Sequence, residues 1–199
     1  MLRKEMRLFG LITEGNLAKK EGPDKVPNSA SSYLSKMRGK GRSPLQVNMK
    51  DVSTGFIGGT ITIFILALLT SATSTPWLIA SFGASCVLAF GVWNSPLSQP
   101  RNIIGGHFIS TFVGLMVYHL FGNEPWSIAL GVGLAIAAMM LTKTTHPPAG
   151  ADPIIVMLGS SHSWGFLFTP VLTGCIVIVL VALLINNLRS DRNYPVFWI

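Results

Sequence analysis

The stretch VSTGFIGGTITIFILALLTSA, at positions 52–72, decides the fold class of this chain. It contains 21 residues and no charged side chain, and a helix needs about 20 apolar residues to cross a bilayer core. The same character continues to Leu188, because residues 52–188 carry only four formal charges, at Arg101, Glu124, Lys143 and Asp152. So few charges cannot coat a water-soluble body. We therefore predict an all-α integral membrane protein with the lipid bilayer as its surroundings.

Charge is distributed unevenly along the 199 residues. Charged residues make up 12% of the chain, against about 25% in soluble domains, and residues 1–50 hold 11 of the 15 Lys and Arg. We predict a basic cytoplasmic N-terminal extension at 1–49, a transmembrane domain at 50–189 and a short C-terminal tail at 190–199. An anionic membrane surface accounts for the net charge of +7, so no nucleic-acid partner is expected.

Six apolar segments follow the extension, four of them long and two, the second and fifth, short or broken. They are Val52–Ala72, Trp77–Trp93, Ile103–Phe121, Trp126–Leu141, Pro147–Gly159 and Trp164–Leu188. If all six cross, every loop Lys and Arg falls on the side of the N-terminal extension, as the positive-inside rule requires. We predict six crossings with both termini in the cytoplasm, in the inner (plasma) membrane of a bacterium.

The hydrophobic pattern indicates an internal duplication. Segments one to three and four to six each read as a long helix, a short segment and a long helix, and Gly83-Ala84-Ser85 corresponds to Gly150-Ala151-Asp152. Three spans per unit make the second unit inverted, which is a common transporter architecture with the site where interrupted helices meet. A 3+3 inverted repeat is one prediction, and chance similarity is the competing explanation.

The stretch TTHPPAGADP, at positions 144–153, carries the most chemistry. Prolines 147 and 148 are tolerated at the start of a helix but not inside one. The free N–H groups at Ala149, Gly150 and Ala151 would then form an electropositive helix start beside His146 and Lys143, and such a start can seat an anion. The competing interpretation is structural, a helix start held by proline and packed through small residues.

This stretch resembles the signature of the HPP family of integral membrane proteins, named for the run His146-Pro147-Pro148. Four further stretches are similar to that family: YLSKMRGKGRSPL at 33–45, SFGASCVLAFG at 81–91, SPLSQPRNIIGGH at 95–107 and RNYPVFW at 192–198. Together they cover roughly residues 32–199, and the chain looks like a bacterial-type member. The resemblance implies a membrane protein with four predicted spans, related to plant chloroplast members linked to nitrite transport. Our six crossings depart from that number.

Ionisable and polar residues define the candidate site. Asp152 is the one acid well inside an apolar segment, which marks a functional hypothesis in a membrane protein, and we assign proton coupling to Asp152 and His107. We expect His146, Ala149, Gly150 and Ala151 to bind substrate opposite Ser81, Gly83 and Ser85. Arg101 and Lys143 are assigned to the cytoplasmic mouth. The competing roles are a helix-terminal carboxylate for Asp152 and a topology-fixing charge for Arg101.

Other site chemistries lack a pattern in the sequence. Cys86 and Cys175 match no zinc spacing, the histidines show no ligand spacing, and no nucleophile or nucleotide motif occurs. We therefore expect no enzyme activity, no cofactor and no metal. The predicted function is a homo-oligomeric transporter or channel for a small inorganic anion, with nitrite named by the resemblance and coupling to protons. The alternatives are a non-transporting membrane scaffold or sensor, and a transporter of a cation or neutral solute.

Overall fold

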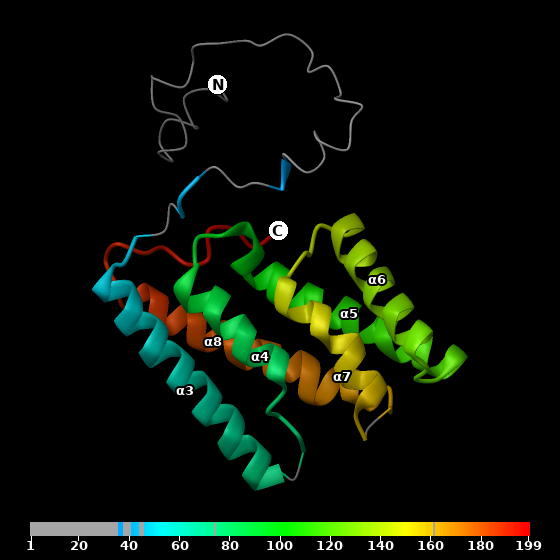
Figure 1. The fold of residues 1–199 in the computed structure, drawn as a ribbon. Helices are drawn as coiled ribbons and strands as arrows, with labels where there is room; N and C mark the ends of the chain where they lie inside the picture. The colour runs from blue at the N-terminus through cyan, green and yellow to red at the C-terminus, as the bar shows by residue number, and fades with distance from the viewer. Residues whose placement is uncertain (1–35, 38–40, 44–45, 74, 161) are drawn as a thin grey trace. The chain divides into compact units, whose positions relative to one another are not determined.

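The computed structural model describes residues 36–37, 41–43, 46–73, 75–160 and 162–199. The coordinates divide into two compact units, Met1–Leu45 and Gln46–Ile199. The predicted extension at 1–49 therefore lies largely outside the described residues. The second unit is helical, with no strand among the residues described in it, and it carries all six predicted segments (Figure 1).

Each predicted segment corresponds to one helix or to two joined helical pieces. The elements are α3 (Met49–Thr73), α4 (Ala80–Cys86), η2 (Val87–Gly91), η3 (Pro96–Ser98), α5 (Pro100–Phe121), α6 (Pro125–Leu141), η4 (Pro147–Ala151), α7 (Asp152–Leu158), η5 (Leu167–Leu172) and α8 (Thr173–Asn187). The two short segments are the broken ones, because α4 passes into the π turn η2 and the 3₁₀ turn η4 passes into α7. Within the described residues, three helices are long and apolar enough to span a membrane: Met49–Thr73, Pro100–Phe121 and Leu167–Asn187.

Local sequence explains where these helices begin and end. Pro100, Pro125 and Pro147 each occupy the first turn of a helix, where the missing N–H has no intrahelical partner to lose. Helix α5 ends at Gly122, whose φ of 73° is a conformation that glycine adopts at little cost. Proline at the start and glycine at the end thus set α5 as a single helix of 22 residues.

Successive segments run in opposite directions, so the connections gather at two ends (Figure 1). At one end, Asp51 near the start of α3 bonds Arg189 after α8 at 2.6 Å, and Arg101 at the start of α5 donates to the Thr142 carbonyl oxygen after α6. At the other end, the His119 ring bonds the His162 carbonyl oxygen. Every Lys and Arg described in residues 46–199 belongs to the first end.

The two halves pack against each other in corresponding pairs. Helix α5 packs against α6 as α8 packs against α3, and η2 packs against α3 as α7 packs against α6. The two short segments meet each other through α4 and η4. A 3+3 inverted repeat would give the same pairs of contacts, and the repeat itself stays a prediction.

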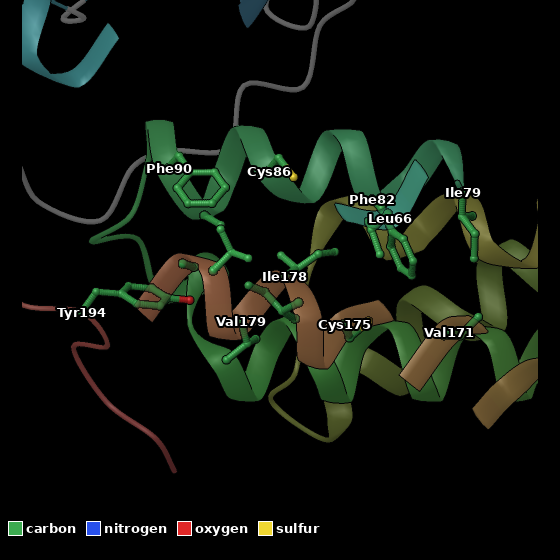
Figure 2. Packing of buried hydrophobic residues seen from close by; sticks show 14 residues of the cluster. Leu66, Ile79, Phe82, Cys86, Phe90, Val171, Cys175, Ile178, Val179 and Tyr194 are labelled. Carbon is green, nitrogen blue, oxygen red and sulfur yellow. The ribbon is translucent and has the colours of Figure 1, made fainter. Parts of the chain in front are cut away.

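The larger apolar cluster lies between the first short segment and the last helix. Figure 2 shows Phe82, Cys86 and Phe90 along α4 and η2, with Cys175 and Ile178 on the neighbouring α8. A Cβ added at Gly58 would meet the Phe90 ring, so the cluster also includes α3. A side chain at Gly174 would run into the Phe82 ring, so glycine there allows the two helices to approach. In lipid such close van der Waals packing, and not transfer from water, is what holds helices together.

Candidate functional site

The candidate site lies where the two short segments meet beside α5. Its four central side chains are those of Ser85 on α4, His107 on α5, His146 immediately before η4, and Asp152 at the start of α7. Each of these residues is at most 3% exposed. Four chain segments, far apart in the sequence, thus enclose a polar centre in an apolar body.

The four side chains form one continuous hydrogen-bonded chain. The Ser85 Oγ atom lies 2.8 Å from the Nε2 of His107 and 2.9 Å from the Nε2 of His146. The Nδ1 of His107 is 2.6 Å from Oδ2 of Asp152. The Nδ1 of His146 donates to the Leu97 carbonyl oxygen at 2.8 Å. A line of hydrogen bonds therefore runs from the Leu97 carbonyl oxygen, in the loop before α5, to the buried carboxyl group of Asp152.

Additional hydrogen bonds hold this chain in place. Thr111 donates to Oδ2 of Asp152 at 3.3 Å, and Ser110 donates to the Ala149 carbonyl oxygen at 2.6 Å. A Cβ added at Gly106 would lie 2.6 Å from the Cβ of His146, so α5 approaches that residue through a glycine. The second short segment is thus fixed against α5 by both polar and steric contacts.

The buried carboxyl group of Asp152 has hydrogen-bond partners inside the protein. A buried carboxylate is costly unless it is paired and hydrogen bonded, and His107 supplies the pair. The His107 ring also packs edge-on against Phe82, with ring centroids 5.4 Å apart.

The position along α5 gives the depth of the site. Thr111 lies eleven residues beyond Pro100, which corresponds to about 16 Å along a helix at 1.5 Å per residue. This is about half of a 30 Å hydrocarbon core.

The structure brings together five of the eleven residues that the sequence nominated. Ser85, His107, His146 and Asp152 contact one another, and Ser81 is buried beside them, with a carbonyl oxygen 3.0 Å from the Ser85 Oγ. The Ser81 hydroxyl has no hydrogen-bond partner among the described residues.

The predicted anion seat continues from this centre along the second short segment. Ala149 is buried and its N–H donates to the His146 carbonyl oxygen, whereas Gly150 and Ala151 are half-buried. No described atom lies within 4 Å of a Cβ added at Gly150. The N–H of Ala149 is therefore used within the turn, and the space next to Gly150 is open.

The remaining nominated residues lie elsewhere. Gly83 is exposed on another face of α4, where it lines a cavity of about 570 Å³ together with α3 residues such as Phe56 and Ile63. We expected Gly83 to face the central path, and its position places it outside the hydrogen-bonded centre. Arg101 and the exposed Lys143 lie at the basic end, where the Arg101 guanidinium donates to the Thr142 carbonyl oxygen at 3.2 Å.

Sequence reasoning missed three contributors to the centre: Ser110, Thr111 and the Leu97 carbonyl group. The two hydroxyl residues follow His107 by three and four positions, the spacing that places side chains on one helix face. That spacing could have identified them. No pattern in the sequence indicates that the Leu97 carbonyl oxygen accepts a hydrogen bond from the Nδ1–H of His146.

Other ligand chemistry is absent from the described part of the chain. No group of three or more His, Cys, Asp or Glu side chains there could hold a metal ion. Cys86 and Cys175, both described and both buried, are unpaired thiols.

The fold and the centre define a class, that of multi-pass helical membrane proteins with ionisable side chains enclosed between interrupted helices. Residues 44–195 match the transmembrane region of HPP proteins. The chain belongs to the HPP family of transmembrane proteins.

Two proteins of Dictyostelium discoideum, both named as transmembrane proteins, are similar to this chain. One is 39% identical over 177 residues, covering 83% of this chain and 57% of the relative. The other is 36% identical over 171 residues, covering 80% of this chain and 60% of the relative. The chain thus matches less than two thirds of the length of either relative. No solved structure matches it.

Proposed function

We propose that this protein transports a small inorganic anion, nitrite, across its membrane together with protons. The observation that carries the proposal is the enclosed chain of Ser85, His107, His146 and Asp152. Ionisable groups inside a membrane are costly and occur where ions or protons move. Interrupted helices meeting at mid-depth are the usual place of a transporter site. Nitrite itself is named by the sequence resemblance.

The proposed anion position is next to His146 and the half-buried Gly150 and Ala151. A weak, reversible site for a monovalent anion suits neutral donors better than a buried Arg clamp, because the ion must also leave. Both proposed mouth residues, Arg101 and Lys143, lie at the end from which Leu97 connects to His146. Their positive charge would concentrate anions there.

We assign the basic end to the cytoplasm. All Lys and Arg described between residues 46 and 199 belong to that end, and the positive-inside rule sets orientation from such charges. Both termini of the helical unit are then cytoplasmic. The assignment to a bacterial plasma membrane rests on the sequence resemblance, and the homo-oligomer rests on the small size of the helical body.

The experiment is nitrite uptake by proteoliposomes that contain the full chain, with and without a pH gradient. We expect uptake to exceed that of empty vesicles and to rise when protons are driven in the same direction. Uptake of a cation or a neutral solute instead of nitrite would favour the alternative prediction, a transporter of a cation or neutral solute. Absence of any flux would favour a scaffold or sensor and would contradict the proposal.

A further inference from the structure

We propose that Ser85 passes a proton between His107 and His146, in a centre that holds one proton more than two neutral imidazoles and an ionised Asp152. This inference deepens the proposed function and rests on it for the role of the anion. The proton content itself is argued from the hydrogen bonds alone.

The Nδ1 atom of each ring, which faces away from Ser85, has a partner that fixes whether it carries a hydrogen. The Leu97 carbonyl oxygen can only accept, so the Nδ1 of His146 carries a hydrogen. If Asp152 is ionised, its carboxylate can only accept as well, so the Nδ1 of His107 also carries one. Two neutral imidazoles would then both present a bare Nε2 to Ser85.

Ser85 cannot satisfy two bare nitrogens. Its hydroxyl has one hydrogen, yet the Oγ atom lies 2.8 Å and 2.9 Å from the two Nε2 atoms. One nitrogen would face an oxygen lone pair in a buried site, which is costly. One added proton removes the conflict, because the Nε2–H of His107 then donates to Ser85, and the one Ser85 hydrogen is shared between the Nε2 of His146 and the Ser81 carbonyl oxygen, which lies 3.0 Å from the same Oγ atom.

The added proton leaves the centre without net charge. It belongs to the pair of His107 and Asp152, as an imidazolium next to a carboxylate or as a neutral imidazole next to a carboxylic acid. The titratable groups facing His107 are Asp152 from α7 and His146 from before η4. Cys175 of α8 interacts electrostatically with Asp152. Arg101 and Lys143 lie at the basic end, outside these contacts.

The same geometry allows the proton to move. The Nε2–H bond of His107 breaks as a new O–H bond forms on Ser85, and the former O–H bond of Ser85 breaks as an Nε2–H bond forms on His146. His107 becomes neutral next to the carboxylate of Asp152, and His146 becomes an imidazolium. Where the pair begins as a neutral imidazole and a carboxylic acid, the O–H bond of Asp152 breaks as an Nδ1–H bond forms on His107 in the same step. No proton is gained or lost, but the positive charge moves to the residue next to the proposed anion position.

An arriving anion therefore favours the second arrangement. Nitrite next to Gly150 would stabilise a charged His146 and would not stabilise a charge held by His107 and Asp152 alone. The proton on His146 and the anion next to it then stabilise each other in the site, so they are released together. This is the coupling of nitrite to protons that the proposed function requires. Within the described part of the chain, Ser85 is the one side chain that hydrogen bonds both imidazoles.

The test is ¹⁵N NMR of the full chain in micelles with labelled histidine, with His107 and His146 assigned by single His→Gln variants. Without nitrite at neutral pH, we expect one of two states of His107: hydrogen on both ring nitrogens next to an ionised Asp152, or hydrogen on Nε2 alone next to a protonated Asp152. For His146 we expect hydrogen on Nδ1 alone. Adding nitrite should move the Nε2 hydrogen to His146. Two Nδ1–H neutral rings without nitrite would overturn the proposal.

Variants separate transfer from simple folding. In Ser85→Ala nitrite should leave the His146 signal unchanged, and Ser85→Thr should restore the response. Ser127→Ala removes another buried hydroxyl outside the centre and should behave as the unmodified protein. A nitrite response that persists in Ser85→Ala would overturn the transfer role. If the proton content is as expected but vesicles take up no nitrite, the proposed function fails while the proton count stands.

Discussion

The two short segments, Ala80–Gly91 and Pro147–Leu158, have corresponding places but different chemistry. Each meets the last helix of the opposite half through a glycine, since Gly174 of α8 faces Phe82 and Gly114 of α5 faces Pro153. The first segment supplies one neutral hydroxyl to the centre, that of Ser85. The second supplies Asp152 from its interior and His146 from immediately before its first residue, and both are ionisable.

This difference separates what makes the fold from what makes the site. Small residues at corresponding positions allow the same close packing in both halves, so the scaffold is nearly symmetric. The ionisable groups belong to the second segment and to α5, with the first segment connecting them. A proton pathway therefore requires only one of the two short segments to carry ionisable groups, with the other carrying a neutral relay.

The largest effect is expected from the acid of the second segment. Asp152→Asn removes the carboxylate that pairs with His107, and we expect proton-driven nitrite uptake to fall about 100-fold, in the range of positioned proton-transfer groups. Some passive nitrite conduction should remain. Uptake driven by a pH gradient is the measurement, and full pH-driven uptake in folded Asp152→Asn would contradict the assignment.

The next effect tests the anion position on the same segment. Gly150→Leu fills the open space next to Gly150, and we expect uptake to be lost while the amount of folded protein is unchanged, because no described atom lies within 4 Å of an added Cβ. Gly133→Leu is the matched control, since its surroundings are equally open. Loss of uptake only in proportion to loss of folded protein would make the motif structural.

The packing itself distinguishes the two segments. A Cβ at Gly114 would lie 2.7 Å from the Cα of Pro153, which is backbone, whereas a Cβ at Gly174 meets the Phe82 side chain. We expect Gly114→Ala to lower the free energy of unfolding by about 1–3 kcal/mol, as overpacking does, and Gly174→Ala by less. Thermal unfolding in detergent measures both, and the opposite order would contradict the described packing.

The smallest effect concerns the C-terminal residues, which contact the first short segment, α3 and the connection before α5. Arg192 donates to the Phe90 carbonyl oxygen, and the neighbouring Arg189 hydrogen bonds Asp191 and holds its pKa below the usual 3.8. Because the pKa of Asp191 is lowered in the folded protein, its contact with Arg189 stabilises the fold fully at pH values above 3.8. This stabilisation is lost only as the pH falls through the lower pKa of the folded state. The protection factors of the backbone amides at residues 189–194, which correct exchange rates for their intrinsic pH dependence, should therefore be constant from pH 7 to pH 5, and a change in them within that window would contradict the contact.

Much of this architecture could be predicted from the sequence because lipid imposes simple rules. Apolar length predicted the six segments, and loop charge predicted the shared basic end. The prolines at 147 and 148 and the small residues after them predicted that the fifth segment is broken. The acid inside it identified Asp152.

The centre could be predicted only in part, because it depends on three-dimensional contacts between distant segments. Spacing along the chain cannot show that Ser85 contacts both His107 and His146, which are 22 and 61 residues away. Spacing does place Gly83, two residues before Ser85, on a different face of a helix, but which of the two faces the centre depends on the rotation of α4 about its axis.

The most direct test of the central claim is a double-mutant cycle across the two segments, measured as the rate of proton-driven nitrite uptake. Residues that act as one unit have non-additive effects. If Ser85 and Asp152 belong to one proton pathway, the double variant Ser85→Ala, Asp152→Asn should be no slower than Asp152→Asn alone. A rate reduced by the product of the two single effects would show independent roles and would contradict a single site shared by the two segments.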